Sequence, residues 1–167
     1  MSNLIYLMIS GAVTAYRASE IIAGLSHTFD QIFTVQTPNA MRLISPRDLT
    51  RIPKNQVIES YFDARILPRP PLGTVLFAPC NFNSLNKLAH GIADNLALSI
   101  THEMIGHGQK VAVALSLNEP LFAHPIVRQS IATLTGWGAT VIEPKDVGQG
   151  ITMAPTAEVL AALGILS

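Results

Sequence analysis

Short apolar runs alternate along this chain with stretches in which apolar residues recur at helical spacing. The runs show no apolar-polar alternation, which is typical of parallel strands that are buried on both faces. We therefore predict strands at residues 4–9, 31–36, 56–59, 73–77, 110–116 and 139–142, and helices at 16–25, 40–44, 84–105, 125–134 and 156–163.

The regular alternation of these elements predicts an α/β fold: a Rossmann-like, doubly wound parallel sheet in a three-layer α/β/α sandwich. Segment 67–72 contains three prolines and reads as a rigid loop before the strand at 73–77. No repeat, linker or low-complexity tract divides the sequence. We therefore expect a single domain over residues 1–167.

Charge and composition narrow the class of protein. Eleven basic and eleven acidic residues give a net charge of zero, which argues against a nucleic-acid or electrostatic membrane partner. Only 13% of residues are charged and 49% are hydrophobic, which favours a homo-oligomer. The single cysteine, Cys80, excludes an internal disulfide framework and fits a reducing cytoplasm. The apolar start at 4–9 is too short to span a bilayer.

The most informative stretch is residues 78–96, where an apolar strand stops at Pro79 and amide side chains follow. Asn83 or Ser84 is placed to cap the helix that begins there. Ligands of open parallel sheets bind at such corners, at the carboxyl ends of the strands. The stretch therefore predicts a ligand-binding strand-to-helix corner.

Two further corners carry residues suited to an anionic ligand. Ser10, Gly11, Ala12 and Val13 place small residues at a helix N-terminus, where free N–H groups favour phosphate. The next corner, with Thr37 and Asn39, adds a hydroxyl and an amide.

Each corner also has a purely structural interpretation, a tight turn at Ser10-Gly11 and a helix cap at 37–39. Convergence of all three at one sheet edge would favour an anionic ligand with a planar ring system. We predict that the backbone amides of Gly11 and Thr37 converge with the Asn83 carboxamide on one nucleotide molecule.

The chain also resembles a known family on three motifs. Residues 11–18, Gly-Ala-Val-Thr-Ala-Tyr-Arg-Ala, are similar to an opening Gly-Ser-Ile-Ala-Ala-Tyr-Lys. Residues 79–84 match a Pro-Ala-Ser-Ala-Asn-Thr motif at Pro79 and Asn83, and 88–96 resemble Ile-Ala-Asn-Gly-Ile-Ala-Asp-Asn-Leu. Of a Pro-x-Met-Asn-x-x-Met-Trp motif the chain keeps Asn118. These motifs belong to the homo-oligomeric flavin-containing cysteine decarboxylases.

This resemblance implies bound FMN, a Rossmann-like fold and trimers with flavin at the subunit interfaces. It implies a flavin-dependent oxidative decarboxylation of a small or peptidyl cysteine-type carboxylate, which Asn118 would orient. The flavin contacts that we expect are Ser10, Gly11, Ala12, Val13, Thr37, Asn39, Ala78, Pro79, Asn83 and Ser99.

The chain departs from that family at two places. The family's histidine before the strand that contains Pro79 falls at about Arg65, and no histidine lies between His27 and His90. Arginine stays protonated near neutral pH, so Arg65 would hold a carboxylate or phosphate instead of acting as a base. The segment 143–150 is short and lacks the cysteine of a substrate-covering flap, which argues against coenzyme A synthesis.

These departures keep other functions open. The alternative hypothesis is an FMN-binding redox module, or a subunit of a larger assembly, that does not decarboxylate. Flavin prenyl transfer ranks last, because no basic set for a prenyl phosphate is visible.

Other candidate residues have structural interpretations. We expect no metal site: His102 and His107 are five apart, which turns them about 140° from each other on a helix. We expect Gly108 to end that helix instead. Trp137 is expected to be a turn residue, and His124 is expected to precede a helix that starts at Pro125. Cys80 is expected to fill a small buried position.

Overall fold

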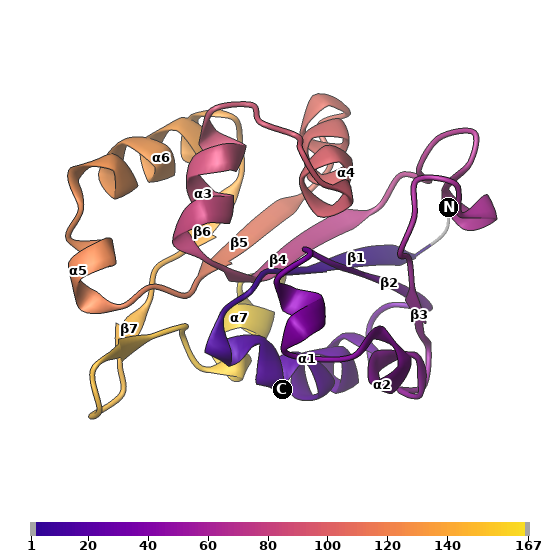
Figure 1. Ribbon diagram of the computed structural model, residues 1–167, viewed down its shortest axis with the longest axis horizontal. Coiled ribbons are helices and arrows are strands. Elements are labelled where there is room, and N and C mark those ends of the chain that lie inside the picture. Colours follow the sequence, from indigo (N-terminus) through magenta and orange to yellow (C-terminus); the bar gives the residue numbers. More distant parts are fainter. Residues whose placement is uncertain (1–2, 166–167) are drawn as a thin grey trace.

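Six parallel strands form the central sheet of the computed structural model, which describes residues 3–165. Their order is β3-β2-β1-β4-β5-β6, so the chain winds outward twice from a central strand (Figure 1). This confirms the predicted Rossmann-like α/β fold. The strands are β1 (Leu4–Ile9), β2 (Gln31–Gln36), β3 (Asn55–Val57), β4 (Thr74–Cys80), β5 (Val111–Leu115) and β6 (Thr140–Ile142).

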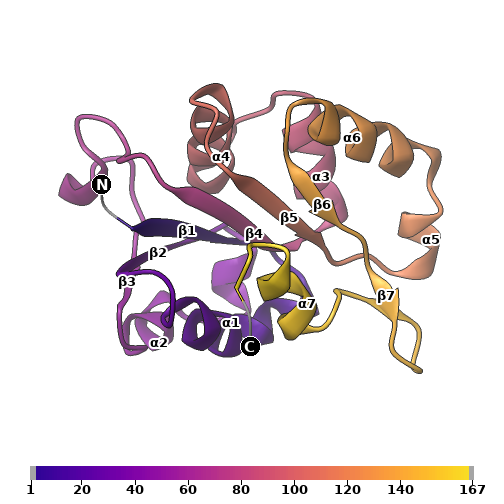
Figure 2. The ribbon, with the colours of Figure 1, turned by 180° about the vertical axis from the view of Figure 1, so that it is seen from behind.

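Helices cover both faces of the sheet (Figures 1 and 2). Successive side chains of β1 point to opposite faces, so Tyr6 and Met8 join one buried cluster and Ile5 and Leu7 join the other. The first cluster includes residues of α3 (Phe82–Ala89), α4 (Leu96–Gly106) and α6 (Pro125–Gly136). The second includes residues of α1 (Ala18–Leu25), α2 (Pro46–Thr50) and α7 (Thr156–Ala161).

The single helix predicted at 84–105 is wrong, because two helices, α3 and α4, occupy this region. Gly91 adopts a positive φ of 70°, a conformation that ends a helix and suits glycine. The Asn95 side chain then accepts a hydrogen bond from the Leu98 amide and starts α4. The chain therefore forms two separate helices here, and each packs on the sheet by itself.

The start of α3 also differs from the prediction. β4 continues through Pro79 to Cys80, with a shift in its register to β5 between Phe77 and Cys80. Proline is accommodated at such irregularities because they remove a ladder hydrogen bond. The cap of α3 is Asn81, whose Oδ1 accepts a hydrogen bond from the Ser84 amide at 2.9 Å, so neither Asn83 nor Ser84 is the cap.

Several short elements complete the fold. The helix predicted at 16–25 begins as a 3₁₀ turn before α1, and the helix predicted at 40–44 is only a 3₁₀ turn. The segment 143–150, expected to be short and without regular structure, is part of a small antiparallel hairpin. A short helix at Glu119–Phe122, α5, was not predicted. These elements are η1 (Val13–Arg17), η2 (Ala40–Arg42), η3 (Ala64–Ile66), α5 (Glu119–Phe122), β7 (Lys145–Asp146) and β8 (Ile151–Thr152).

The helix ends that were read from single residues agree with the structure. His124 caps α6 and Trp137 ends it, and α4 ends just before Gly108, whose φ is 70°. Across residues 3–165, no helix has both the length and the apolar character needed to cross a membrane.

Candidate functional site

A groove lies at the carboxyl ends of β1, β2, β4 and β5. It consists of two cavities of about 620 and about 200 Å³, which share Asn81 and Asn83 in their walls. The larger cavity is also lined by residues of η1, the β5–α5 loop and the β7–β8 hairpin, and the smaller by residues of the β2–η2 corner and of α3. Gly11, Asn83 and Asn118 line the larger cavity, and Thr37, Asn39 and Asn83 line the smaller one. All three predicted corners therefore meet at one edge of the sheet.

The first two corners touch because residue 11 is glycine. A Cβ atom on Gly11 would lie 2.7 Å from Cβ of Asn39 and 3.3 Å from its carbonyl carbon. Real Cβ contacts of that length do not occur, so any larger residue would push the corners apart. Gly11 thus sets how closely the corners after β1 and β2 approach each other.

Free backbone donors line the larger cavity. The N–H groups of Gly11, Val13 and Thr14 have no acceptor within the described chain. Unpaired donors at the first turn of a helix suit an anionic group, because both the hydrogen bonds and the helix dipole favour negative charge. The residues present therefore fit a phosphate-bearing ligand.

Three predicted contacts lie behind the groove and stabilise its wall. Ser10, Ala78 and Pro79 are buried and line neither cavity. The Ser10 hydroxyl donates to the Pro79 carbonyl at 2.7 Å and accepts from the Asn81 amide at 2.9 Å. These bonds join the corner after β1 to the corner after β4.

The predicted role of the Thr37 backbone amide is wrong. That amide donates to the carbonyl of Ile9 at 2.9 Å, because Thr37 still continues the pairing of β2 with β1. The Thr37 hydroxyl, which accepts from the Ala40 amide at 3.4 Å, still lines the smaller cavity.

Two carboxamides provide side-chain donors in the groove. Asn83 is exposed in the first turn of α3 and lines both cavities. Asn118 caps α5, where its Oδ1 accepts from the Leu121 amide at 3.1 Å. Its Nδ2 group is not needed for the cap, so it is available to a ligand in the larger cavity.

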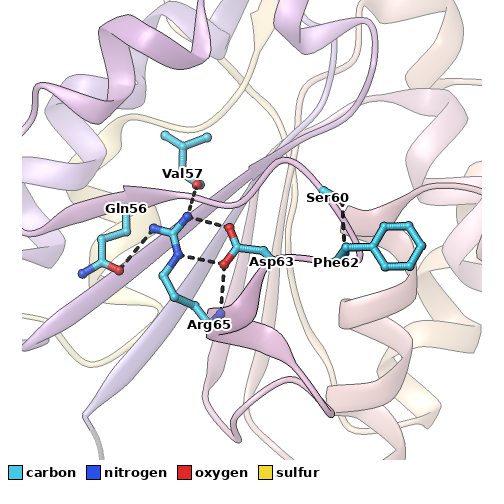
Figure 3. Close-up of polar contacts among 6 residues, drawn as sticks. All are labelled: Gln56, Val57, Ser60, Phe62, Asp63 and Arg65. Atoms are coloured by element: carbon cyan, nitrogen blue, oxygen red, sulfur yellow. Dashed lines mark hydrogen bonds and ion pairs between the residues drawn. The ribbon is translucent and has the colours of Figure 1, made fainter.

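Arg65 and Ser99 lie outside the groove. The Arg65 guanidinium forms a bidentate ion pair with Asp63 and donates to the Val57 carbonyl at 2.9 Å and to Gln56 Oε1 at 3.3 Å (Figure 3). The hydrogen bonds from Arg65 lower the pKa of the Asp63 carboxyl. Ser99 lies in a separate cavity, with its hydroxyl 3.0 Å from that of Tyr61.

Some lining residues had not been predicted. Ser116 was detectable as a polar residue directly after a buried strand, but Thr14 gave no signal of its own. Ile151 and Thr152 bring the β7–β8 hairpin to the larger cavity. Two-residue strands carry too short a pattern to be read from the sequence.

Cys80 is fully buried beside the groove, as expected for a small packing residue. Burial raises the pKa of its thiol, because the charged thiolate would lose its hydration. The thiol therefore stays protonated and unreactive at neutral pH. Between residues 3 and 165, no three His, Cys, Asp or Glu side chains gather to hold a metal ion.

Comparisons with known proteins agree with this geometry. A probable phosphopantothenoylcysteine decarboxylase of Streptococcus mutans is 29% identical over 164 residues, covering 90% of this chain and 91% of the relative. The coenzyme A biosynthesis bifunctional protein CoaBC of Bacillus subtilis is 25% identical over 149 residues, covering 85% of this chain. The chain spans only 36% of that longer relative.

Solved structures of low sequence identity share the fold. The peptidyl-cysteine decarboxylase EpiD superimposes with a TM-score of 0.83 at 21% identity, covering 98% of this chain and 99% of EpiD. The FMN-binding protein AtHal3 gives a TM-score of 0.83 at 18% identity, with 98% and 96% coverage. The model of the family described as Flavoprotein matches residues 2–164. This chain therefore belongs to the Flavoprotein family.

Proposed function

We propose that the chain binds FMN in the groove and acts as an oxidative decarboxylase on a small or peptidyl cysteine-type carboxylate. The unpaired N–H groups of Gly11, Val13 and Thr14 carry this proposal, because these residues line the same cavity as Asn83 and Asn118. Family membership and the printed names of the relatives support the choice of cofactor and reaction.

Backbone groups would bind the phosphate. Among the described residues that line the groove, Lys87 is the only one with a positive charge. It already forms an ion pair with Asp94 at 2.5 Å. Unpaired backbone N–H groups are then the main source of positive potential for an anion. When bound, FMN supplies a two-electron acceptor, which the amino acids of the chain do not provide.

Asn118 would orient the substrate carboxylate by donating from Nδ2 while its Oδ1 keeps the cap of α5. A neutral amide stabilises the negative charge of a carboxylate less than arginine does. Less binding energy is therefore lost when the carboxylate leaves as carbon dioxide. None of the described residues lining the larger cavity carries a charge or titrates near neutral pH. The substrate thiol would therefore lose its proton to solvent or to a group outside this cavity.

A second candidate function is an FMN-binding redox module, or a subunit of a larger assembly. The same absence of an acid-base side chain in the larger cavity favours it. A reductase partner would then reduce the bound flavin, whereas thiol compounds would leave it oxidised.

Two measurements test the proposal. The purified protein should show the absorbance bands of oxidised flavin, and cysteine-ending peptides should lose the mass of carbon dioxide plus two hydrogens. A colourless protein contradicts flavin binding. A yellow protein without product, and without flavin bleaching in the absence of oxygen, contradicts decarboxylation and supports the redox module.

Variants of Asn118 separate binding from folding. Asn118→Asp keeps an oxygen that caps α5 but loses the amide donor, so turnover should fall at least tenfold with little loss of stability. Asn118→Ala should lose turnover and also about 1 kcal/mol of stability. Full activity of Asn118→Asp would remove Asn118 from the proposed mechanism.

We also propose that the chain is one FMN-binding domain, forms a homotrimer or higher homo-oligomer, and works in the cytoplasm. Exposed apolar side chains such as Phe62 and Val13, which are 86% and 78% exposed, support self-association. The single buried cysteine is compatible with a reducing compartment.

A further inference from the structure

We propose that the hydroxyl groups of Thr14 and Ser116 form a specificity pair that binds an uncharged hydroxyl or amide group of the substrate. The inference rests on the proposed function, because it assigns a substrate class to the same groove. It concerns the part of the substrate next to the reacting carboxylate.

The pair joins two distant parts of the chain. Thr14 lies in η1 and Ser116 directly follows β5, 102 positions later, yet their hydroxyl oxygens are 2.7 Å apart. Both residues are half-buried and both line the larger cavity. The two hydroxyls therefore present one combined polar surface to a ligand.

Hydrogen-bond accounting leaves this pair with unused capacity. Two hydroxyls carry two donor hydrogens and four acceptor lone pairs, and their mutual bond uses one of each. In the described part of the chain neither hydroxyl has another hydrogen bond. One donor and three acceptor sites remain, so the pair can bind a group that donates, accepts or does both.

The position of the pair places it at the substrate end of the groove. Ser116 is two residues before Asn118, on the same loop. Thr37 and Asn39 line only the smaller cavity, whereas Thr14, Ser116 and Asn118 line only the larger one. A nucleotide whose phosphate accepts from the Thr14 backbone amide and which extends toward Thr37 leaves the Thr14 hydroxyl, bonded to Ser116 on the Asn118 loop, for the substrate.

Charge selects the class of group that the pair accepts. None of the described residues lining the larger cavity is ionised, and the proposed phosphate and carboxylate already use the free N–H groups and the Asn118 amide. A further anionic group beside the pair would therefore lose hydration without gaining a counter-ion. A hydroxyl or carboxamide gains hydrogen bonds there. An apolar group of the same shape would leave the spare donor unpaired, which costs about 1–3 kcal/mol, or roughly 5- to 150-fold.

The test compares cysteine-ending peptides whose penultimate residue is threonine or valine, which have the same shape. We expect the wild-type protein to favour the threonine peptide by about tenfold in kcat/KM, and to disfavour a glutamate peptide. Thr14→Val and Ser116→Ala should reduce the preference to below twofold. Thr14→Ser, which keeps the hydroxyl, should retain it.

Thr133→Val is the matched control, because Thr133 donates to the Gln129 carbonyl on α6 and lines neither cavity. It should leave the preference unchanged. A wild-type protein without the preference, or Thr14→Val and Ser116→Ala variants that keep it, would overturn the inference. Loss of bound FMN in these variants, measured by absorbance, would also overturn it, because the pair would then belong to the cofactor site.

Failure of the proposed function gives a different result. If yellow protein decarboxylates no peptide, calorimetric titration of the same peptides measures their Kd values directly. A threonine preference in Kd that disappears in both variants would support the pair without the reaction. Equal Kd values for the two peptides would overturn the pair.

Discussion

Gly11 is the residue whose replacement has the most direct consequence for the groove. Its lack of a side chain lets the backbone after β1 approach Asn39 after β2. Gly11→Ala should therefore separate the two corners, at a cost of about 1–3 kcal/mol in stability, and weaken flavin binding. Urea unfolding and flavin absorbance per mole of protein measure the two effects.

Gly136→Ala is the control for this substitution. A Cβ atom on Gly136 would meet no heavy atom within 4 Å, and the residue is exposed at the end of α6. Alanine there should keep the flavin and leave the stability unchanged or raised by up to about 1 kcal/mol. Equal flavin loss in the two variants would contradict the steric explanation.

Cys80 makes the free energy of unfolding depend on pH in the alkaline range. Burial raises the pKa of its thiol in the folded state above the value of about 8.5 for an unfolded chain. As the pH rises past 8.5, the unfolded state loses the proton first, so the stability from Cys80 is complete below that pH and falls above it.

We expect the free energy of unfolding to fall between pH 8 and 10 in the wild-type protein, and to fall less in Cys80→Ala. Urea titrations at both pH values measure this difference. Rapid labelling of the native thiol by a maleimide at pH 7.5 would contradict its burial.

At the scale of elements, the loop after β3 is stabilised from within by Arg65. Its guanidinium bonds to Asp63, Val57 and Gln56, while Phe62 points away on the other side of the loop (Figure 3). Arg65→Lys keeps the charge but loses the planar fork, so residues 58–66 should be cleaved faster by protease. Because the ion pair is partly exposed, the global stability should fall by less than about 1 kcal/mol.

The exposed Arg51 supplies a matched control, since Arg51→Lys changes a surface charge with no ion pair among the described residues. It should alter neither the cleavage pattern nor the flavin content. A large loss of turnover in Arg65→Lys with unchanged cleavage would instead support the catalytic role predicted for Arg65.

Local patterns explain which elements could be predicted. Strands β1, β4 and β5 were found because buried parallel strands are continuous apolar runs, whereas the edge strand β3 has Val57 as its one apolar residue. The break between α3 and α4 was missed because Leu88, Ile92 and Leu96 keep helical spacing across Gly91. The spacing describes side chains, whereas the break depends on the backbone at Gly91 and on the cap at Asn95.

The site could be predicted in part for a similar reason. Gly11, Asn83 and Asn118 follow strand ends, and the topology of a parallel sheet brings such positions together. Arg65 and Ser99 were assigned only from the family resemblance. Their positions depend on tertiary contacts with Asp63 and Tyr61, which no local pattern reveals.

For the whole molecule, zero net charge and exposed apolar side chains favour assembly. We expect light scattering to give a mass that is a multiple of 17.9 kDa, with three copies as the basic unit. Phe62→Ser should shift this distribution toward smaller masses, because Phe62 is 86% exposed on a loop that Arg65 stabilises. A monomer at micromolar concentration would contradict the proposed oligomer.

The packing of α7 on α1 has a consequence for protein synthesis. Leu160 occupies the space that a side chain on Gly24 would need, and Val159 is fully buried in the same layer. A ribosome makes Leu160 more than a hundred residues after Gly24. Until α7 docks, this side of the core of the nascent polypeptide stays in contact with water and is a binding surface for chaperones.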